Sequence, residues 1–236
     1  MLVHGNGPQV GLLALQNNAF DKVTPYPLDV LGAESQGMIG YMLQQSLKNQ
    51  LPQQEISVLL TQVEVDAADP AFQNPTKYIG PVYDKAQADA WAREKGWQFN
   101  ADGKGYRRVV PSPQPKRILD SDAISALMQR DHLVICNGGG GVPVVEKADG
   151  LHGIEAVIDK DLSTALLARE IHADVLAITT GVEKVCINFG KPNQQALDTV
   201  SVAQMTRYRE EATSRRAACC PKSSPRWNFY TTAAGA

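Results

Sequence analysis

The amino-acid sequence predicts an α/β fold, a three-layer α/β/α sandwich around a mostly parallel sheet, with an inserted lid subdomain. Three observations support this prediction. Short apolar strands alternate with helices along the chain. Two glycine-rich turns follow strands, at His4–Gln9 and at Asn137–Gly141. Between them, the stretch from Glu64 to Lys116 is rich in proline, aromatic and polar residues, as expected of an insertion.

Composition excludes several classes of protein. The 236 residues are 43% hydrophobic and 20% charged, enough apolar content to fill a core and too much for a disordered chain. The net charge of −2 argues against a nucleic-acid partner. No run of 18 apolar residues and no secretory signal is visible, so we expect no membrane partner and a cytoplasmic protein. The four cysteines and four histidines lack metal-ligand spacing, so no metal ligand is assigned.

The first elements follow from proline, glycine and apolar runs. We expect a strand stub at Leu2–Val3 and a helix beginning at Pro8, since a proline in the first helical turn lacks an N–H that would have no partner there. A second helix is predicted over Asp29–Asn49. Its three glycines cost helix stability, so we expect them to pack closely on a neighbour. The apolar run Ile56–Val63 predicts a strand.

The remaining elements continue the alternation. Within the insertion we expect short strands and a helix over Lys85–Lys95. Asp120-Ser121-Asp122 predicts a capped helix start, because short polar side chains accept hydrogen bonds from the first turn. Further elements are predicted at His132–Cys136 (buried strand), Lys160–His172 (helix), Asp174–Thr179 (buried strand), Glu183–Ile187 (short strand) and a last helix capped by Ser201. The predicted domains are a core of residues 1–62 and 117–211, a lid of 63–116 and a tail of 212–236.

The two glycine turns predict a phosphate site. Glycine lets backbone N–H groups approach an anion closely, and a helix N-terminus adds a favourable dipole. Both turns fall at the carboxyl ends of strands, where open α/β sheets bind ligands. Each turn alone could equally be only a tight turn, but two in one sheet favour the phosphate site. Neither turn matches the Walker pattern or the dinucleotide fingerprint.

Two lysines are candidates for neutralising a transferred phosphoryl group. Lys160 stands between Asp159 and Asp161, which would hold it charged and oriented. The alternative is a solvated helix start, where acidic residues are favourable. Lys77 lies in a loop between two prolines that restrict the backbone, and its alternative is an ordinary solvated lysine.

Together these motifs resemble the carbamate kinase family, within the amino acid kinase fold. The resemblance covers Val3 to about Glu211, and the segments around Asp69–Tyr83 and Arg107–Ile118 are specific to this branch. The matching segments are VHGNGPQVG at Val3–Gly11, ESQGMIGY at Glu34–Tyr41, DPAFQNPTKYIGPVY at Asp69–Tyr83, RRVVPSPQPKRI at Arg107–Ile118, NGGGGVPV at Asn137–Val144 and AVIDKDLSTALLA at Ala156–Ala168.

The resemblance implies reversible phosphoryl transfer from ATP, with Mg²⁺, to carbamate, giving ADP and carbamoyl phosphate. It also implies a homodimer and only small-molecule substrates. In this family Lys160 would bridge the transferred phosphoryl, Asp161 would orient the lysines, and Lys77 would reach carbamoyl phosphate from the lid. The remaining implied site residues are Gly5, Asn6, Gly7, Gly138, Gly139, Gly140 and Gly141 for substrate and phosphate, and Thr179, Thr180, Gly181, Val182 and Glu183 for the nucleotide. Many relatives carry an acid at the position of Thr180.

Two departures from the family pattern lead to further expectations. The family has a strand, a glycine loop and a helix upstream of the segment that begins this chain, which predicts an N-terminal truncation. Ala212–Ala236 holds four of the 23 cations and none of the 25 acids, so the preceding residues carry −6. Allowed codons for Ala212–Lys222, read with one added G in front, give GHFPAGSMLPK, the family's missing GSMxPK-type segment. We therefore hypothesise a frame-shift or sequencing error there, a poorly ordered tail and impaired activity.

Two other functions remain open from the sequence. One is an inactive fragment or a residual nucleotide- or phosphate-binding module. The other is a kinase for a related small carboxylate or carbamate, since the lid around Lys77 favours carbamate but does not exclude a close analogue.

Overall fold

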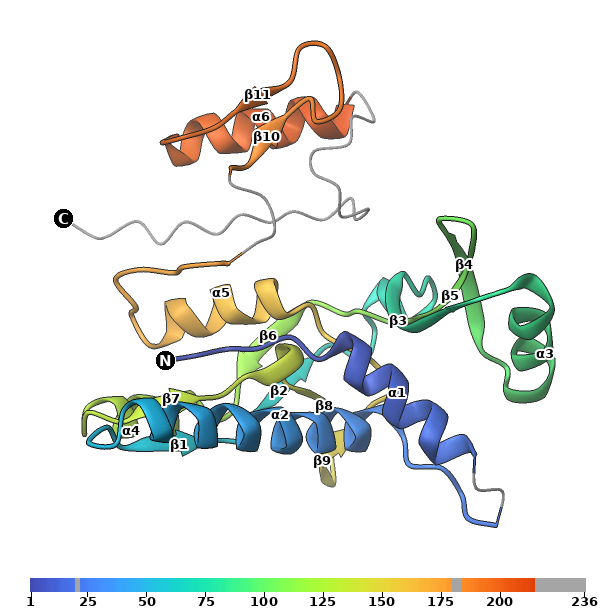
Figure 1. Cartoon of the computed structure of the whole chain (residues 1–236), viewed down its shortest axis with the longest axis horizontal. Helices are drawn as coiled ribbons and strands as arrows, with labels where there is room; N and C mark the ends of the chain where they lie inside the picture. The colour runs from blue at the N-terminus through green and yellow to red at the C-terminus, as the bar shows by residue number, and fades with distance from the viewer. Residues whose placement is uncertain (20–21, 180–183, 215–236) are drawn as a thin grey trace. The chain divides into compact units, whose positions relative to one another are not determined.

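The computed structural model describes residues 1–19, 22–179 and 184–214, with side chains as far as Glu211 (Figure 1). The chain divides into two compact units, Met1–Ala173 and Asp174–Ala236. The elements of the first unit are α1 (Gly7–Asn18), α2 (Leu28–Gln50), β1 (Ile56–Val58), β2 (Gln62–Val65), η1 (Pro70–Phe72), β3 (Lys77–Tyr83), α3 (Lys85–Lys95), β4 (Gln98–Asp102), β5 (Gly105–Val110), β6 (Pro115–Ile118), α4 (Ser121–Met128), β7 (Leu133–Ile135), η2 (Gly138–Gly140), β8 (Val142–Lys147), β9 (Gly150–Gly153) and α5 (Lys160–Glu170).

Parallel pairing organises the centre of the first unit. β1 pairs in parallel with β7, from Ile56 opposite Leu133 to Val58 opposite Ile135. Leu2 forms a single parallel bridge to Ile135 on the other edge of β7. A four-stranded sheet has the order β6-β2-β8-β9, in which β2 and β8 are parallel and the outer two pairs are antiparallel.

The strand predicted over Ile56–Val63 is wrong as one element, because the structure divides it between two sheets. The division lies at Thr61, whose backbone N–H donates to Oε1 of Gln36 at 2.9 Å and whose carbonyl accepts from Gln36 Nε2 at 3.3 Å. A side chain of α2 thus occupies the Thr61 N–H that an uninterrupted β1 would give to a ladder, while the Thr61 carbonyl also accepts the N–H of Val142 at 2.8 Å.

Helices cover both sides of these strands. α5 packs on β6, whereas α2 packs on β1 and β8, and Figure 1 shows the two helices on opposite sides of the strands. The predicted three-layer α/β/α arrangement is confirmed. α5 is buried over seven consecutive residues, from Leu162 to Ala168, as expected of a helix within a core rather than at its surface.

A separate three-stranded antiparallel sheet, in the order β3-β5-β4, carries α3 at its outer end (Figure 1). The bounds of α3 agree with the predicted helix over Lys85–Lys95, and Asp84 caps the start of this helix with a capping box. α1 packs on β3 with almost no side-chain material between them. A Cβ placed on Gly11 would lie 2.0 Å from Cα of Gly80, so the two backbones meet directly.

Two apolar clusters fill the first unit. One joins the four-stranded sheet to α4, β7 and α5, through residues such as Val63, Ile118, Ile124, Val134 and Leu167. The other joins α1 and α2 to the β3-β5-β4 sheet, through residues such as Val10, Leu31, Ile79, Val110 and Val157.

The prediction that all three glycines of α2 pack closely is only partly right. A Cβ on Gly40 would lie 2.5 Å from Cγ1 of Val58, so α2 approaches β1 closely there. A Cβ on Gly32 or Gly37 would meet nothing within 4 Å. The capped start predicted at Asp120 also needs correction, because its carboxylate accepts from the backbone N–H of Gln62 at 2.7 Å and makes no side-chain hydrogen bond to its own helix.

The second unit contains an antiparallel pair and a helix, namely β10 (Cys186–Ile187), β11 (Gln195–Ala196) and α6 (Val202–Ser214). Ser201 caps α6 as predicted, since its Oγ accepts from the backbone N–H of Gln204 at 3.2 Å. The buried strand predicted at Asp174–Thr179 is wrong, because these residues form no strand and Val175 is 79% exposed. No described helix is both long and apolar enough to cross a membrane.

Candidate functional site

The first glycine loop, His4–Gln9, leads directly into α1. Asn6 occupies the position before this helix, but its side chain does not cap it. Instead, the buried Asn6 Nδ2 donates to Ser35 Oγ at 2.8 Å, and Ser35 donates to the carbonyl of Gly32 at 2.7 Å. Asn6 therefore anchors the loop to α2 and leaves the first turn of α1 without a side-chain cap. Such a turn is a ready anion site.

The second glycine loop has four residues with left-handed backbone conformations. The φ angles are 52° at Asn137, 66° at Gly139, 100° at Gly140 and 88° at Gly141. Glycine adopts such angles without the steric cost that other residues bear. The Gly139 N–H donates to the carbonyl of His4 at 2.8 Å. The structure thus brings together the two loops that the sequence predicted to share a site.

The loops leave no room for larger residues at their contact. A Cβ on Gly139 would lie 2.0 Å from Asn6 Nδ2, and a Cβ on Gly138 would lie 2.4 Å from the His4 ring. A Cβ on Gly140 would approach the carbonyl oxygen of Ile158 to 2.7 Å. Glycine is therefore required here both for backbone angle and for space.

A buried network of polar side chains anchors the second loop to the neighbouring elements. Asn137 is fully buried, its N–H donates to Thr61 Oγ1 at 2.8 Å, and its Oδ1 accepts from Ser163 Oγ at 2.9 Å. Thr61 is in turn held by Gln36. Sequence reasoning missed this network as part of the site. A usable signal was present, since Gln36 and Ser163 are polar residues inside otherwise apolar faces of two helices.

Lys77 and Asp159 join the start of β3 to the start of α5. Lys77 Nζ lies 2.7 Å from Asp159 Oδ2. Asp159 Oδ1 accepts from the backbone N–H groups of Asp161 at 3.0 Å and Leu162 at 3.4 Å, which caps α5. Burial alone would raise the pKa of Asp159, but Lys77 and these N–H groups outweigh it and lower the pKa. Asp159 therefore stays ionised at neutral pH.

Lys160 lies over the first glycine loop. A Cβ on Gly5 would be 3.5 Å from Cδ of the Lys160 side chain, an ordinary contact. Lys160 Nζ donates to Asp161 Oδ1. The prediction that two flanking carboxylates hold Lys160 is thus half right, because Asp161 contacts Lys160 whereas Asp159 pairs with Lys77.

The charges at the site balance and are accessible. The side chains of Lys77, Lys160, Asp159 and Asp161 are between 29% and 38% exposed, so each can reach a ligand. Partial burial lowers the pKa of His4, while the bond from its Nδ1 to the Gly5 carbonyl at 3.0 Å opposes this. His4 is therefore neutral at pH 7, and the two lysines supply the positive charge.

The residues predicted to bind a nucleotide lie in the second unit. Thr179 is exposed and belongs to no helix or strand. Thr180, Gly181, Val182 and Glu183 lie outside the described residues, as does the tail from residue 215 onwards. Within the part of the chain that the structure describes, no group of three or more histidine, cysteine or acidic side chains is placed to hold a metal ion.

Comparison with known proteins relates this geometry to one family. A sequence model of the amino acid kinase family matches residues 1–217. Carbamate kinase of Escherichia coli is 59% identical over 196 residues, which are 83% of this chain and 65% of that protein. The chain thus spans slightly under two thirds of this relative's length.

Solved structures give the same result. Carbamate kinase from Giardia lamblia bound to citric acid matches with a TM-score of 0.83 and 39% identity, over 89% of this chain and 68% of that chain. The same enzyme bound to AMP-PNP matches with a TM-score of 0.79 and 40% identity, over 89% and 69%.

Proposed function

Because the chain belongs to the amino acid kinase family and, within it, to the carbamate kinases, we propose that it transfers a phosphoryl group reversibly between ATP and carbamate. One observation carries the proposal. Two lysines from distant parts of the chain, Lys77 and Lys160, lie beside two glycine loops that contact each other. This arrangement provides positive charge and backbone N–H groups, which are the main requirements of phosphoryl transfer.

In the proposed reaction, a carbamate oxygen attacks the γ-phosphorus of ATP, and the bond to the bridging β,γ-oxygen breaks to release ADP. The nucleophile is already an anion, so no proton has to be removed. The uncapped first turn of α1 would bind phosphoryl oxygens. Gly138–Gly141 would shape the cradle beside it, since the N–H groups of Gly139, Gly140 and Gly141 already donate to backbone carbonyls. Lys160 would stabilise the charge that spreads over the phosphoryl group, and Asp161 would hold Lys160 in place.

Lys77 brings the lid into this mechanism. Its ammonium group would contact the phosphoryl group of carbamoyl phosphate while Asp159 fixes its position. The lid would also exclude water, which would otherwise hydrolyse the product.

Magnesium fits this site as an ion carried by the nucleotide. Mg²⁺ is usually held by one or two carboxylates together with substrate phosphates rather than by a protein cage. Among the described residues no such cage exists, and Asp161 Oδ2 is a carboxylate oxygen not used by the Lys160 contact. Asp161 would therefore supply the protein oxygen, and the ion would neutralise charge on the phosphates.

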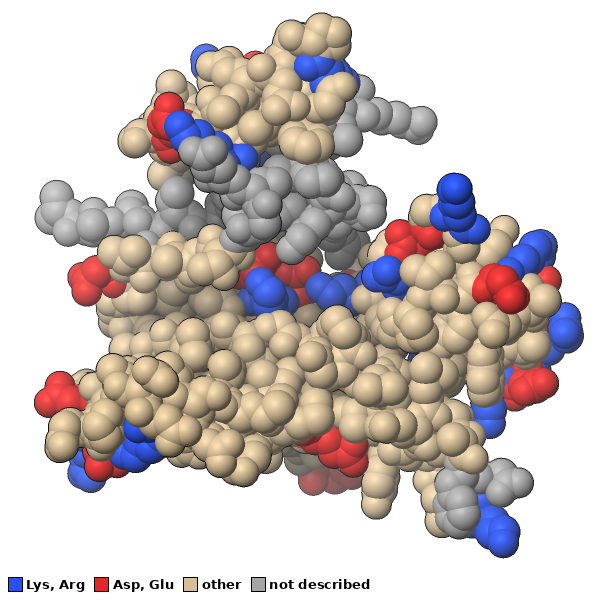
Figure 2. Space-filling model, viewed as in Figure 1, with Lys and Arg blue, Asp and Glu red and all other residues tan. Residues whose placement is uncertain are grey.

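The remaining parts of the proposal concern the nucleotide, the partner and the compartment. We assign the nucleotide to Thr179, Thr180, Gly181, Val182 and Glu183. We also propose a homodimer. Met38, Tyr41 and Met42 are exposed on one face of α2, and Figure 2 shows that the visible face of this helix is largely uncharged. A second copy would cover this strip. We place the protein in the cytoplasm, where a thiol such as that of the buried Cys136 stays reduced.

The direct test is ATP formation from carbamoyl phosphate and ADP, with Lys160→Met and the exposed Lys147→Met as a matched pair. We expect the Lys160 variant to lose about 10²–10³-fold in kcat and the Lys147 variant to match the parent chain. Equal activity of both variants would contradict the role of Lys160.

Other outcomes distinguish the alternatives. Calorimetric binding of ADP without turnover would indicate a nucleotide-binding module. Turnover with acetyl phosphate in preference to carbamoyl phosphate would indicate a kinase for another small carboxylate. A folded chain that neither binds ADP nor turns over would contradict the proposed function.

A further inference from the structure

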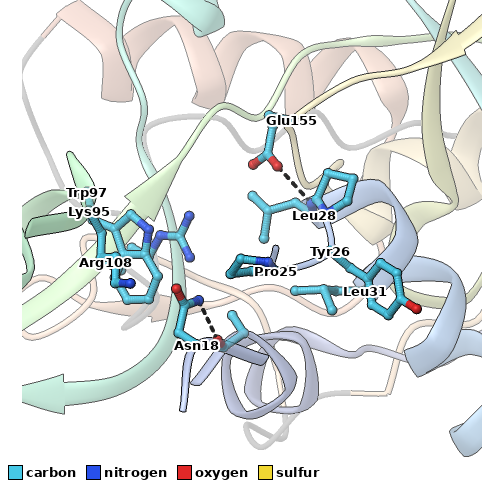
Figure 3. Close-up of a pocket in the computed structure, with 11 residues that line it drawn as sticks. Asn18, Pro25, Tyr26, Leu28, Leu31, Lys95, Trp97, Arg108 and Glu155 are labelled. Carbon is cyan, nitrogen blue, oxygen red and sulfur yellow. Dashed lines mark hydrogen bonds between the residues drawn. The ribbon is translucent and has the colours of Figure 1, made fainter. Parts of the chain in front are cut away.

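A second pocket lies away from the glycine loops, at the other end of α1 (Figure 3). Its volume is about 370 Å³, and it lies wholly within the first unit. The lid sheet and the α3–β4 connection form one wall, and α1, α2 and the segment before α2 form the other. The residues that matter for its chemistry are Asn18, Pro25, Tyr26, Trp97, Arg108 and Glu155.

Arg108 gives this pocket a concealed positive charge. Its guanidinium lies 3.9 Å from the centroid of the Trp97 ring, and Trp97 in turn stacks on Trp91 at 5.4 Å. Stacking fixes the plane of the guanidinium, and Figure 3 shows it directed into the cavity. It donates no hydrogen bond to any side chain or carbonyl among the described residues. Its planar set of N–H donors is therefore available to a ligand.

Arg108 remains charged in spite of its burial. Burial lowers the pKa of Arg108, Glu155 and Tyr83 oppose that effect, and the pKa falls to about 10. The group is thus protonated at neutral pH, while its hydration is already partly removed. Because water is already partly excluded from Arg108, an anion that binds here removes less water from the arginine than it would at an open surface.

Among the described residues that line the pocket, Glu155 is the acidic one, and its charge acts on Arg108 while one of its oxygens is held by the backbone. Glu155 Oε1 accepts the backbone N–H of Leu28 at 2.9 Å, at the start of α2, where negative charge is favourable. Lys95 lines the same pocket and adds a second cation. The charge that faces the cavity is therefore positive in excess, although Glu155 would repel a dianion more strongly than a monoanion.

The opposite wall is apolar. The accessible part of this wall is formed by Pro25 and Tyr26, which are exposed, whereas Leu28 and Leu31 are only 4% and 2% exposed. Asn18 uses its amide N–H on the carbonyl of Ala14 at 2.8 Å, which leaves its Oδ1 toward the pocket as an acceptor. A ligand that fits both walls has one anionic end and a short hydrocarbon body.

We propose that this pocket binds a small organic monocarboxylate, with the carboxylate on the Arg108 fork and the hydrocarbon body against Pro25 and Tyr26. The planar guanidinium matches a carboxylate through two parallel hydrogen bonds. Glu155 disfavours a phosphate dianion at the same place. Because Arg108 and Trp97 belong to the lid whereas Pro25 and Glu155 belong to the core, the bound carboxylate contacts both parts at once. The site is separate from the phosphoryl-transfer site and does not depend on that assignment.

The test uses 4-methylpentanoate as the probe and 4-methylpentanamide as its uncharged counterpart, in calorimetry and saturation-transfer NMR on the full chain. We expect the carboxylate to bind the parent protein about tenfold more tightly than the amide. Arg108→Gln should lose this preference, whereas Arg93→Gln, an exposed cation on α3, should retain it. Lys160→Met should bind the probe as the parent does.

Three results would overturn the proposal. Equal binding of carboxylate and amide would show that charge recognition is absent, and unchanged binding by Arg108→Gln would place the probe elsewhere. Loss of binding in Lys160→Met, or displacement of the probe by ADP with carbamoyl phosphate, would place it in the transfer site. Circular dichroism checks the fold of each variant, and if Arg108→Gln does not fold, the comparison of carboxylate with amide on the parent protein still decides.

Discussion

Glycine is needed at position 139 for two separate reasons, the backbone angle and the lack of space for a Cβ. Its φ of 66° disfavours any residue with a Cβ, and the place that a Cβ would occupy already holds the Asn6 amide. Asn6 cannot move aside freely, because it is buried and donates to Ser35. The first reason applies to Gly103 but the second does not, since its φ is 62° and nothing lies within 4 Å of its Cβ position.

Alanine substitutions at Gly103 and Gly139 separate the cost of backbone strain from the cost of crowding. Gly103→Ala should lower the free energy of unfolding by about 1 kcal/mol, the cost of a left-handed alanine. Gly139→Ala should lower it by about 2–4 kcal/mol, because overpacking against Asn6 adds to the same strain. Urea unfolding at pH 7 measures both, and equal losses would show that the two glycine loops do not constrain each other.

The charge of Asp159 gives a prediction for pH. Its pKa in the folded protein lies below the ordinary value of 3.8, so the ionised form stabilises the fold. That stability is fully present above the ordinary pKa and is lost as the pH falls through the lowered one. Asp159→Asn keeps the capping geometry, because asparagine caps helices as well as aspartate does, and removes only the charge.

We therefore expect Asp159→Asn to be less stable than the parent by about 1 kcal/mol or less at pH 7, since both partners of the ion pair are partly exposed. The difference should be constant from pH 7 to about pH 5 and shrink below pH 4. Thermal melts across this range provide the measurement. A difference that persists unchanged at pH 3 would mean that Lys77 does not set the charge state of Asp159.

At the scale of elements, the glycines of α2 show how a helix can be constrained at one point only. Gly40 lets α2 lie against Val58 of β1, whereas Gly37 faces open space on the same helix. In a helix, glycine costs stability relative to alanine unless close packing requires it.

Gly37→Ala should accordingly raise the free energy of unfolding by about 0.5–1 kcal/mol, through lower entropy of the unfolded chain. Gly40→Ala should lower it by about 1–3 kcal/mol, because its methyl group would enter the Val58 side chain. Thermal denaturation of both variants gives opposite shifts of the melting temperature if α2 packs on β1 as described. Shifts of the same sign would contradict that packing.

Elements whose residues carry their own signal could be predicted from sequence, and others could not. The helix over Lys85–Lys95 has its cap and its periodicity in adjacent residues, and its bounds were correct. The break in Ile56–Val63 depends on Gln36, 25 residues away, so no local pattern could show it. The apolar run Asp174–Thr179 lacks a strand because pairing needs a neighbouring strand, which a run of apolar residues does not specify.

The same distinction applies to the site. Glycine loops and lysines are visible as motifs, and the structure places the two loops and both lysines together. The pairing of Lys77 with Asp159 joins residues 82 apart, and the bond between Asn137 and Ser163 crosses from a loop to α5. Such partners are fixed by the tertiary fold, so sequence spacing assigned Asp159 to Lys160 instead.

At the scale of the whole molecule, we propose that the lid is a separable part of the fold, because the residues at which it begins and ends lie close together. Lys77 and Val110 face each other in the antiparallel pair of β3 and β5, so their backbones lie about 5 Å apart. The main core cluster around Val63, Ile118 and Leu167 contains no residue from between them. A two-residue Asn-Gly turn could therefore replace residues 78–109.

We expect this shortened chain to melt cooperatively, with a free energy of unfolding about 2–5 kcal/mol lower because the second cluster loses Ile79. Ile79→Ala in the full chain should lose a similar amount and serves as the control. Calorimetry measures both. If the shortened chain has no cooperative transition while Ile79→Ala retains one, the lid is an integral part of the core.

The direct backbone contact between Gly11 and Gly80 has a mechanical consequence. At this one point no side chain lies between α1 and β3, and Val10 and Ile79 belong to the same apolar cluster, so the two elements are rigidly coupled. A displacement of β3 would be transmitted to α1, whose first turn is proposed to bind phosphoryl oxygens. A methyl group at Gly11 would enter the backbone of Gly80 and so displace the strand that begins at Lys77, whereas one at Gly80 would lie 3.4 Å from Gly11.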